Sequence, residues 1–182
     1  MNKNPSKTEI INQAIKFHLQ GNILKATKYY QYCINQRFQD PRILSNYGII
    51  LKDLGKLKEA EQSTRKAITL NPNFADAHSN LGNILKDLGK LKEAEFSYRK
   101  AIEIKPDYAE GHYNLGNILI DLGKFEDAEV SYRKVIEIKP DFAEGHSNLG
   151  NILKELSKFE DAEISYRKAI EIKPDYAEAY YN

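Results

Sequence analysis

Three histidines at one spacing are the first residues in the sequence that suggest metal chemistry. His78, His112 and His146 are 34 residues apart. A fixed period of this size is typical of stacked structural repeats, and neighbouring packed helices lie about 8–10 Å apart. Zinc needs its ligands at about 2 Å. The three imidazoles therefore cannot share one ion, and we predict packed histidines with no metal and no other cofactor.

A nucleophilic centre is not indicated either. A catalytic thiol needs a histidine held beside it, and Cys33, the single cysteine, has no histidine at a fixed spacing. His78–Ser79 and His146–Ser147 are sequence neighbours, which diverge around a helix. Glycine-rich phosphate loops and zinc-protease motifs are absent from the sequence. The sequence therefore predicts that this chain is not an enzyme.

Basic pairs recur at the same spacing and suggest nucleic acid at first sight. The pairs are Arg65-Lys66, Arg99-Lys100, Arg133-Lys134 and Arg167-Lys168. A glutamate lies four residues before each arginine, which is the favourable order for ion pairs within a helix. We therefore expect a self-neutralising outer face and no nucleic-acid partner. Beside this face lie Phe96, Val130 and Ile164, which either pack between repeats or form an outer stripe for a second contact.

Composition excludes further classes of protein. The 182 residues include 27 Lys and Arg against 26 Asp and Glu, a net charge of +1. No run approaches the roughly 18 apolar residues of a membrane span, so no membrane partner is expected. The polar first ten residues lack the apolar core of a signal peptide. The sequence predicts a cytoplasmic protein.

The period of 34 residues organises the whole chain. Prolines, glycines and alanines recur at this spacing, four of each: Pro72, Pro106, Pro140, Pro174; Gly48, Gly82, Gly116, Gly150; and Ala60, Ala94, Ala128, Ala162. We divide the chain into an N-terminal segment with a degenerate capping repeat (1–40), four 34-residue units (41–176) and the start of a further helix (177–182). The last segment predicts a fragment boundary, whose uncapped end could stack on another molecule.

Each unit is expected to form two helices and no strand. In 75–108, apolar residues recur at helical spacing on both sides of Gly89, where a left-handed residue would end the first helix. Pro106 ends the second helix. Asp107 is predicted to cap the next helix, with Glu110 completing a capping box, and Asp141/Glu144 and Asp175/Glu178 repeat the arrangement. The mid-helix Gly82 is explained if Ala94 and Ala101 of the second helix approach it closely.

The pattern resembles the tetratricopeptide repeat over residues 7–176. The resemblance rests on Leu-Gly eight residues into the unit and on Gly, Ala, Tyr, Ala and Pro at positions 15, 20, 24, 27 and 32. The chain departs from the family where Ser157 replaces the turn glycine and where histidine stands in place of tryptophan. The resemblance implies a right-handed α-solenoid of antiparallel helix pairs whose first helices line a concave groove, and a function in binding proteins or peptides.

In the family's geometry, positions 2, 5, 6, 9, 12 and 13 of each unit face the groove. Asparagine dominates positions 6 and 9, with Ile49 interrupting the second series. A carboxamide both donates and accepts, as a peptide backbone does, and the rows resemble the asparagine-lined arrays of the O-linked N-acetylglucosamine transferases. The alternative is that the amides bond neighbouring helices. The predicted peptide-binding residues are Asn46, Asn80, Asn83, Asn114, Asn117, Asn148, Asn151, Lys86, Lys154 and Tyr113.

Two functions fit this groove. The first is a scaffold that binds extended peptide segments. The second is the substrate-recognition arm of a larger transferase whose catalytic domain lies outside the chain, as the resemblance to bacterial arrays preceding such domains implies. The basic residues of a carboxylate clamp are missing, because position 6 is asparagine and Arg42 is the one basic residue at position 2.

Overall fold

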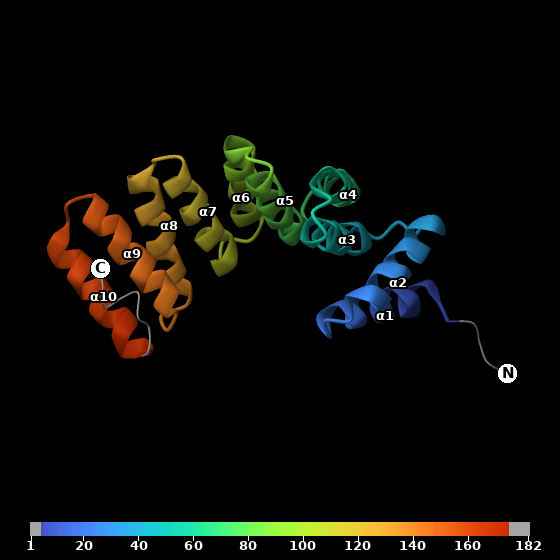
Figure 1. Ribbon diagram of the computed structural model, residues 1–182, viewed down its shortest axis with the longest axis horizontal. Coiled ribbons are helices and arrows are strands. Elements are labelled where there is room, and N and C mark those ends of the chain that lie inside the picture. The colour runs from blue at the N-terminus through green and yellow to red at the C-terminus, as the bar shows by residue number, and fades with distance from the viewer. Residues whose placement is uncertain (1–4, 175–182) are drawn as a thin grey trace. The chain divides into compact units, whose positions relative to one another are not determined.

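The structure is a computed structural model that describes residues 5–174, and in this part of the chain it is built of helices alone (Figure 1). The helices form two units, residues 1–90 and 91–182. The first unit holds α1 (Lys7–Leu19), α2 (Ile23–Asn35), α3 (Pro41–Asp53), α4 (Leu57–Leu70) and α5 (Ala75–Asp87). The second unit holds α6 (Leu91–Ile104), α7 (Ala109–Asp121), α8 (Phe125–Ile138), α9 (Ala143–Glu155) and α10 (Phe159–Ile172).

The helices follow the sequence period. The starts of α3, α5, α7 and α9 lie 34 residues apart, and so do those of α4, α6, α8 and α10. We call the odd-numbered helices A helices and the even-numbered ones B helices. The predicted all-α repeat of helix pairs is therefore confirmed. The assignment of residues 1–40 as a cap stays a prediction, and the further helix predicted from residue 177 lies outside the described residues.

Residues in the left-handed conformation follow the A helices at the predicted turn positions, which include Gly89 and Ser157. Gly89 has φ +73°; its N–H donates to Lys86 O, and the N–H of Lys90 donates to Leu85 O. This pair of bonds is the Schellman motif. Ser157 adopts the same conformation with φ +58° and the same two bonds. A side chain at this φ is strained, so the serine is tolerated here and not favoured.

The predicted capping boxes are wrong. The N-cap residues of α7 and α9 are Tyr108 and Phe142, and neither side chain makes a capping hydrogen bond. The N–H of Tyr108 bonds to Lys105 O, which closes a turn with Pro106 and Asp107 at its centre. Proline presets the dihedral angle of such a turn. The Pro-Asp pair is therefore used to make the bend, and the helix starts one residue later than expected. The third predicted cap, Asp175/Glu178, lies outside the described residues.

The mid-helix glycines make room for an aromatic ring. A Cβ atom on Gly116 would lie 2.8 Å from Cζ of Tyr132, and one on Gly150 would lie 2.6 Å from Cε1 of Tyr166. Real Cβ contacts are not this short. The A helix therefore lies against the tyrosine of its own B helix, and this tyrosine accounts for the glycine at these two positions. The close approach of Ala94 and Ala101 to Gly82 stays a prediction.

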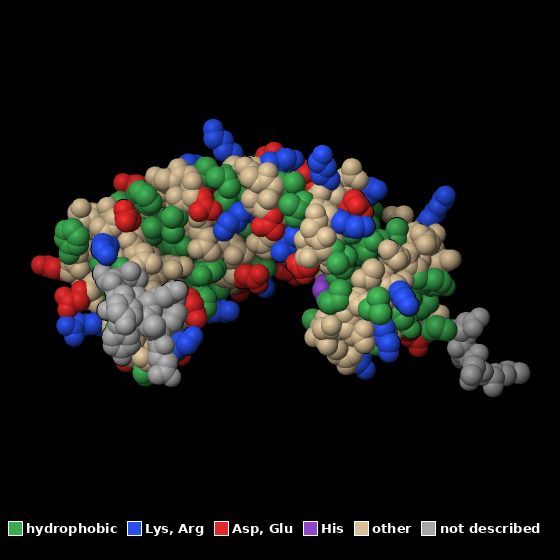
Figure 2. All heavy atoms as spheres, in the orientation of Figure 1, with side chains coloured by type: hydrophobic (Ala, Val, Ile, Leu, Met, Phe, Trp, Pro, Cys, Tyr) green, Lys and Arg blue, Asp and Glu red, His purple; other side chains and the backbone are tan. Residues whose placement is uncertain are grey.

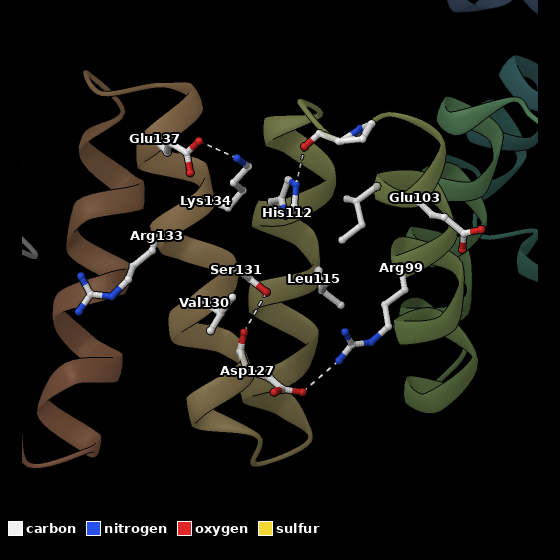
Figure 3. A pocket seen from close by; sticks show the side chains of 12 residues that line it. Arg99, Glu103, His112, Leu115, Asp127, Val130, Ser131, Arg133, Lys134 and Glu137 are labelled. Carbon is white, nitrogen blue, oxygen red and sulfur yellow. Dashed lines mark hydrogen bonds and ion pairs between the residues drawn. The ribbon is translucent and has the colours of Figure 1, made fainter.

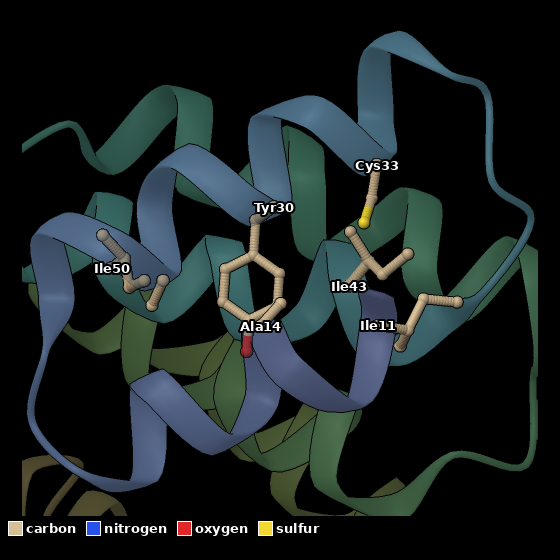
Figure 4. Packing of buried hydrophobic residues seen from close by; sticks show 7 residues of the cluster. Ile11, Ala14, Tyr30, Cys33, Ile43 and Ile50 are labelled. Carbon is tan, nitrogen blue, oxygen red and sulfur yellow. The ribbon is translucent and has the colours of Figure 1, made fainter. Parts of the chain in front are cut away.

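The core of the first unit shows how the degenerate repeat packs. Tyr30 lies between α1 and α3 with its side chain fully buried, in contact with a set of small and aliphatic residues (Figure 4). The set consists of Ile11, Ala14, Ala26, Cys33, Ile43 and Ile50. Cys33 is fully buried as a small packed residue, as predicted.

The charged side chains pair as the sequence predicts. Arg99 and Glu95, Arg133 and Glu129, and Arg167 and Glu163 form ion pairs one turn apart at 3.1, 2.9 and 2.6 Å. Positive and negative side chains are interleaved on the face shown in Figure 2. Across residues 5–174, none of the helices has both the length and the apolar composition that a bilayer crossing requires.

Candidate functional site

The asparagines of position 6 join neighbouring A helices. Asn80 on α5 donates from Nδ2 to Oγ of Ser45 on α3 at 3.0 Å. Asn148 on α9 donates to the hydroxyl of Tyr113 on α7 at 3.3 Å. Both bonds link position 6 of one repeat to position 5 of the preceding repeat. These two amides therefore have a structural use, which was the alternative left open by the sequence.

The asparagines of position 9 are held by the buried tyrosines. Tyr132 donates its hydroxyl hydrogen to Oδ1 of Asn117 at 2.7 Å, and Tyr166 donates to Oδ1 of Asn151 at 2.8 Å. Burial raises the pKa of both phenols, so both hydroxyls stay protonated donors at neutral pH. Each bond engages the oxygen of a carboxamide. It orients the amide while the NH₂ end is left for a different bond.

The exception in the asparagine series follows from the same contact. Ile49 stands at position 9 in the repeat whose tyrosine is replaced by Thr64. The Thr64 hydroxyl is buried and has no hydrogen-bond partner within residues 5–174. A threonine is too short to reach position 9 as the phenol does. An asparagine at that position would therefore lack this hydrogen-bond partner.

The other predicted residues lie on the A helices as expected. Asn46 on α3 bonds to the Tyr30 phenol. Burial raises the pKa of Tyr30 to about 12, and the hydrogen bond from Asn46 opposes this rise. Asn114 is half-buried on α7. The remaining predicted residues of α5 and α9 all have interaction partners; they are Asn83, Lys86 and Lys154.

Tyr113 is the centre of an aromatic cluster on the A-helix face. Its ring lies edge-on to Tyr132 and to Phe142, with ring centres 6.0 and 5.4 Å apart. Beside it is a small hollow of about 170 Å³. The hollow is lined by Ala109, Glu110, Tyr113, Val135, Lys139 and Phe142. A single side chain of a bound segment would fit this volume.

The serines at position 5, which the family's geometry places on the groove, are buried. Ser79 and Ser147 are each 1% exposed, and neither hydroxyl has a hydrogen-bond partner within residues 5–174. Ser45 at the same position accepts from Asn80, 35 residues further along the chain.

The three histidines hold the bends between repeats. Nε2 of His78, His112 and His146 lies 2.9 Å from the carbonyl oxygen of Pro72, Pro106 and Pro140, respectively. Each ring thus bonds to the last turn of the preceding repeat, which confirms that they pack at repeat junctions. Within residues 5–174, the structure contains no group of three or more His, Cys, Asp or Glu side chains placed to hold a metal ion.

Comparison with known proteins agrees with this architecture. A family model described as TPR repeat matches residues 48–89, 82–119 and 116–157, and one described as Tetratricopeptide repeat matches 143–176. No curated protein matches the chain.

Solved structures share the fold. The crystal structure of MamA is 24% identical over 90% of this chain and 96% of its own, with a TM-score of 0.79. YrrB, described as a TPR protein with an unusual peptide-binding site, is 23% identical over 97% and 91%, with a TM-score of 0.78. TTC0263, a thermophilic TPR protein from Thermus thermophilus, is 19% identical over 96% and 95%, with a TM-score of 0.71.

The helix pairs, the turn residues and these similarities define a helical-repeat protein of the α-solenoid class. The chain belongs to the tetratricopeptide repeat family. Family and fold together support a protein–protein interaction scaffold.

Proposed function

We propose that the chain binds extended segments of partner proteins along the A-helix face that carries the asparagine rows. The observation that carries the proposal is the pair of bonds from Tyr132 to Asn117 and from Tyr166 to Asn151. Each bond fixes a carboxamide through its oxygen, so that the NH₂ group can donate to a backbone carbonyl of the bound segment. Preorganised donors lose little conformational entropy on binding.

The position-6 amides contribute less to this proposal. Asn80 and Asn148 already donate to neighbouring A helices, and their carboxamide oxygens can accept. A bound segment would therefore meet donors from position 9 and acceptors from position 6. Those two groups match the carbonyl and the N–H of an extended backbone. The peptide-binding site named for YrrB supports a peptide-binding function here by analogy of fold.

The experiment exchanges one donor without losing the structural bond. Asn117→Asp keeps an oxygen that can accept from Tyr132 and replaces the NH₂ donor by a second acceptor. Gln62→Glu makes the same amide-to-carboxylate change on α4 and is the matched control. Peptides of twelve residues selected on the full chain from a random displayed library are labelled and titrated by fluorescence anisotropy.

We expect Asn117→Asp to weaken binding of the selected peptides about tenfold, equivalent to about 1.4 kcal/mol, and Gln62→Glu to leave it unchanged. Equal affinity of all three proteins would refute the donor row. Circular dichroism and a urea midpoint must show that Asn117→Asp remains folded.

A second use of the same face is as the substrate-recognition arm of a larger transferase. In that case the selected segments would be substrates of the attached domain. In both cases we propose a cytoplasmic chain that carries out no reaction itself.

A further inference from the structure

The B helices of the second unit expose a row of large apolar side chains. Phe96 on α6, Val130 on α8 and Ile164 on α10 are 63%, 69% and 66% exposed. Single exposed apolar residues are ordinary, but these three stand at the same register in three successive B helices. We call these three residues the outer stripe. In the first unit, α4 carries Gln62 at this register.

A groove lined by Val130 of the outer stripe lies between α6 and α8 (Figure 3). Its volume is about 700 Å³. Ile102 from α6, Leu115 from α7 and Val130 from α8 supply apolar lining. Arg99 crosses from α6 to Asp127 on α8 at 3.0 Å and closes one end. The groove is large enough for several aliphatic side chains.

The polar groups around the groove are already paired. Lys134 bonds to Glu137 at 2.6 Å, and Glu103 to Lys100 at 2.7 Å. The Ser131 hydroxyl donates to Asp127 O. The other pairs are Arg99 with Glu95 and Asp127, Arg133 with Glu129, and His112 with Pro106 O. The groove is therefore an apolar channel with a neutral rim whose donors and acceptors are in use.

This lining selects the kind of occupant. An extended segment would bring backbone N–H and C=O groups against an apolar wall, and buried groups of this kind need partners. A helix satisfies its own backbone groups. A neutral rim also offers nothing to a strongly acidic or basic partner, so complementarity favours an uncharged contact face.

The exposed area limits the size of the contact. At these exposed fractions, the three side chains of the outer stripe leave roughly 300 Å² of apolar side-chain surface open. A stable protein–protein interface buries about 800 Å² on each partner. The three side chains alone supply less apolar surface than such an interface, of which a little over half is apolar, and this amount suits one docked helix.

We propose that the outer stripe and its groove bind an amphipathic helix of a partner protein through an uncharged aliphatic face. The bond from Arg99 to Asp127 joins α6 to α8. A helix laid across α6, α8 and α10 would present apolar residues to the residues of the stripe. This surface is separate from the asparagine rows on the A helices.

The test uses a designed peptide and the full chain. The probe is a labelled 18-residue Ala/Gln-based helix with leucines every third or fourth residue on one face, and a scrambled isomer of the same composition is its control. The variant is Phe96→Gln/Val130→Gln/Ile164→Gln. Glutamine already stands at this register in α4 as Gln62, and it favours helix, so the variant should fold; should its circular dichroism fall, Val130→Gln alone replaces it.

We expect the amphipathic probe to bind the natural chain, and its affinity to fall about tenfold or more for the scrambled isomer and for the glutamine variant. Asn117→Asp should not change it, which separates this surface from the proposed function. The proposal is overturned by equal affinity for the variant, by no binding of the probe, or by light scattering that shows a dimer of the chain abolished by the glutamine variant.

Discussion

The hydroxyl of Tyr132 donates to Oδ1 of Asn117 across 2.7 Å, joining the B helix of one repeat to the half-buried asparagine row of its own A helix. The Tyr132 ring also fills the space above Gly116, where any Cβ would collide with it. One buried side chain thus sets both the distance between the two helices and the orientation of a predicted binding group. Stability and binding are coupled at this residue.

Removing the hydroxyl alone separates these effects. Tyr132→Phe keeps the ring against Gly116 and deletes the bond to Asn117. We expect a loss of about 1 kcal/mol in the free energy of unfolding, the typical net value of one such hydrogen bond, measured by urea denaturation. Tyr166→Phe should cost a similar amount through Asn151. Unchanged midpoints for both variants would contradict the role of the phenols.

Adding a methyl group tests the close approach. Gly116→Ala improves intrinsic helix propensity by up to about 1 kcal/mol, yet places Cβ 2.8 Å from the Tyr132 ring. We expect overpacking to win, with a net loss of about 1–3 kcal/mol in a urea titration. In the background Tyr132→Ala, where the ring is absent, Gly116→Ala should become neutral or stabilising. The same cost in both backgrounds would rule out a clash with the ring.

Much of this fold follows from residue spacing. The 34-residue period predicted the helix pairs, and the Glu-to-Arg spacing predicted the ion pairs, because both depend on local geometry. The predicted capping boxes were wrong because Pro106 and Asp107 form a turn. Residue types alone do not decide whether Asp107 caps a helix or takes part in that turn. The asparagine rows were found, but the bond to Tyr132 depends on which side chains face each other across two helices. Ile49 replaces the asparagine in the repeat where Thr64 replaces the tyrosine, and this joint replacement was the indication of the bond in the sequence.

The left-handed turn residue offers a reciprocal pair of substitutions. Ser157 has φ +58° and Gly123, at the same place in the preceding repeat, has φ +70°. Ser157→Gly should raise stability by about 1 kcal/mol, since glycine avoids the cost of a side chain at positive φ. Gly123→Ser should lower stability by a similar amount. Differential scanning calorimetry measures both, and shifts of the same sign would refute the argument.

The glutamates that join successive B helices predict a dependence on pH. Burial by itself would raise the pKa of Glu129, but hydrogen bonds from Lys158 and Arg133 outweigh burial and hold that pKa below its usual range. A carboxyl whose pKa is lower in the folded state stabilises the fold above the ordinary value of about 4.3. The stabilisation is lost as the pH falls through that value towards the folded pKa.

Glu129→Gln should therefore unfold at a lower urea concentration than the natural chain at pH 7, and the difference should shrink as the pH falls below about 4.3. Glu163→Gln is the matched control, because Glu163 is paired with Arg167 within one helix and its side chain is 64% exposed. Exposed pairs of this kind contribute little, about 0.3–0.5 kcal/mol. A Glu129→Gln deficit that stays constant from pH 7 to 3 would mean that packing, rather than the charge that binds Lys158, accounts for the role of this residue.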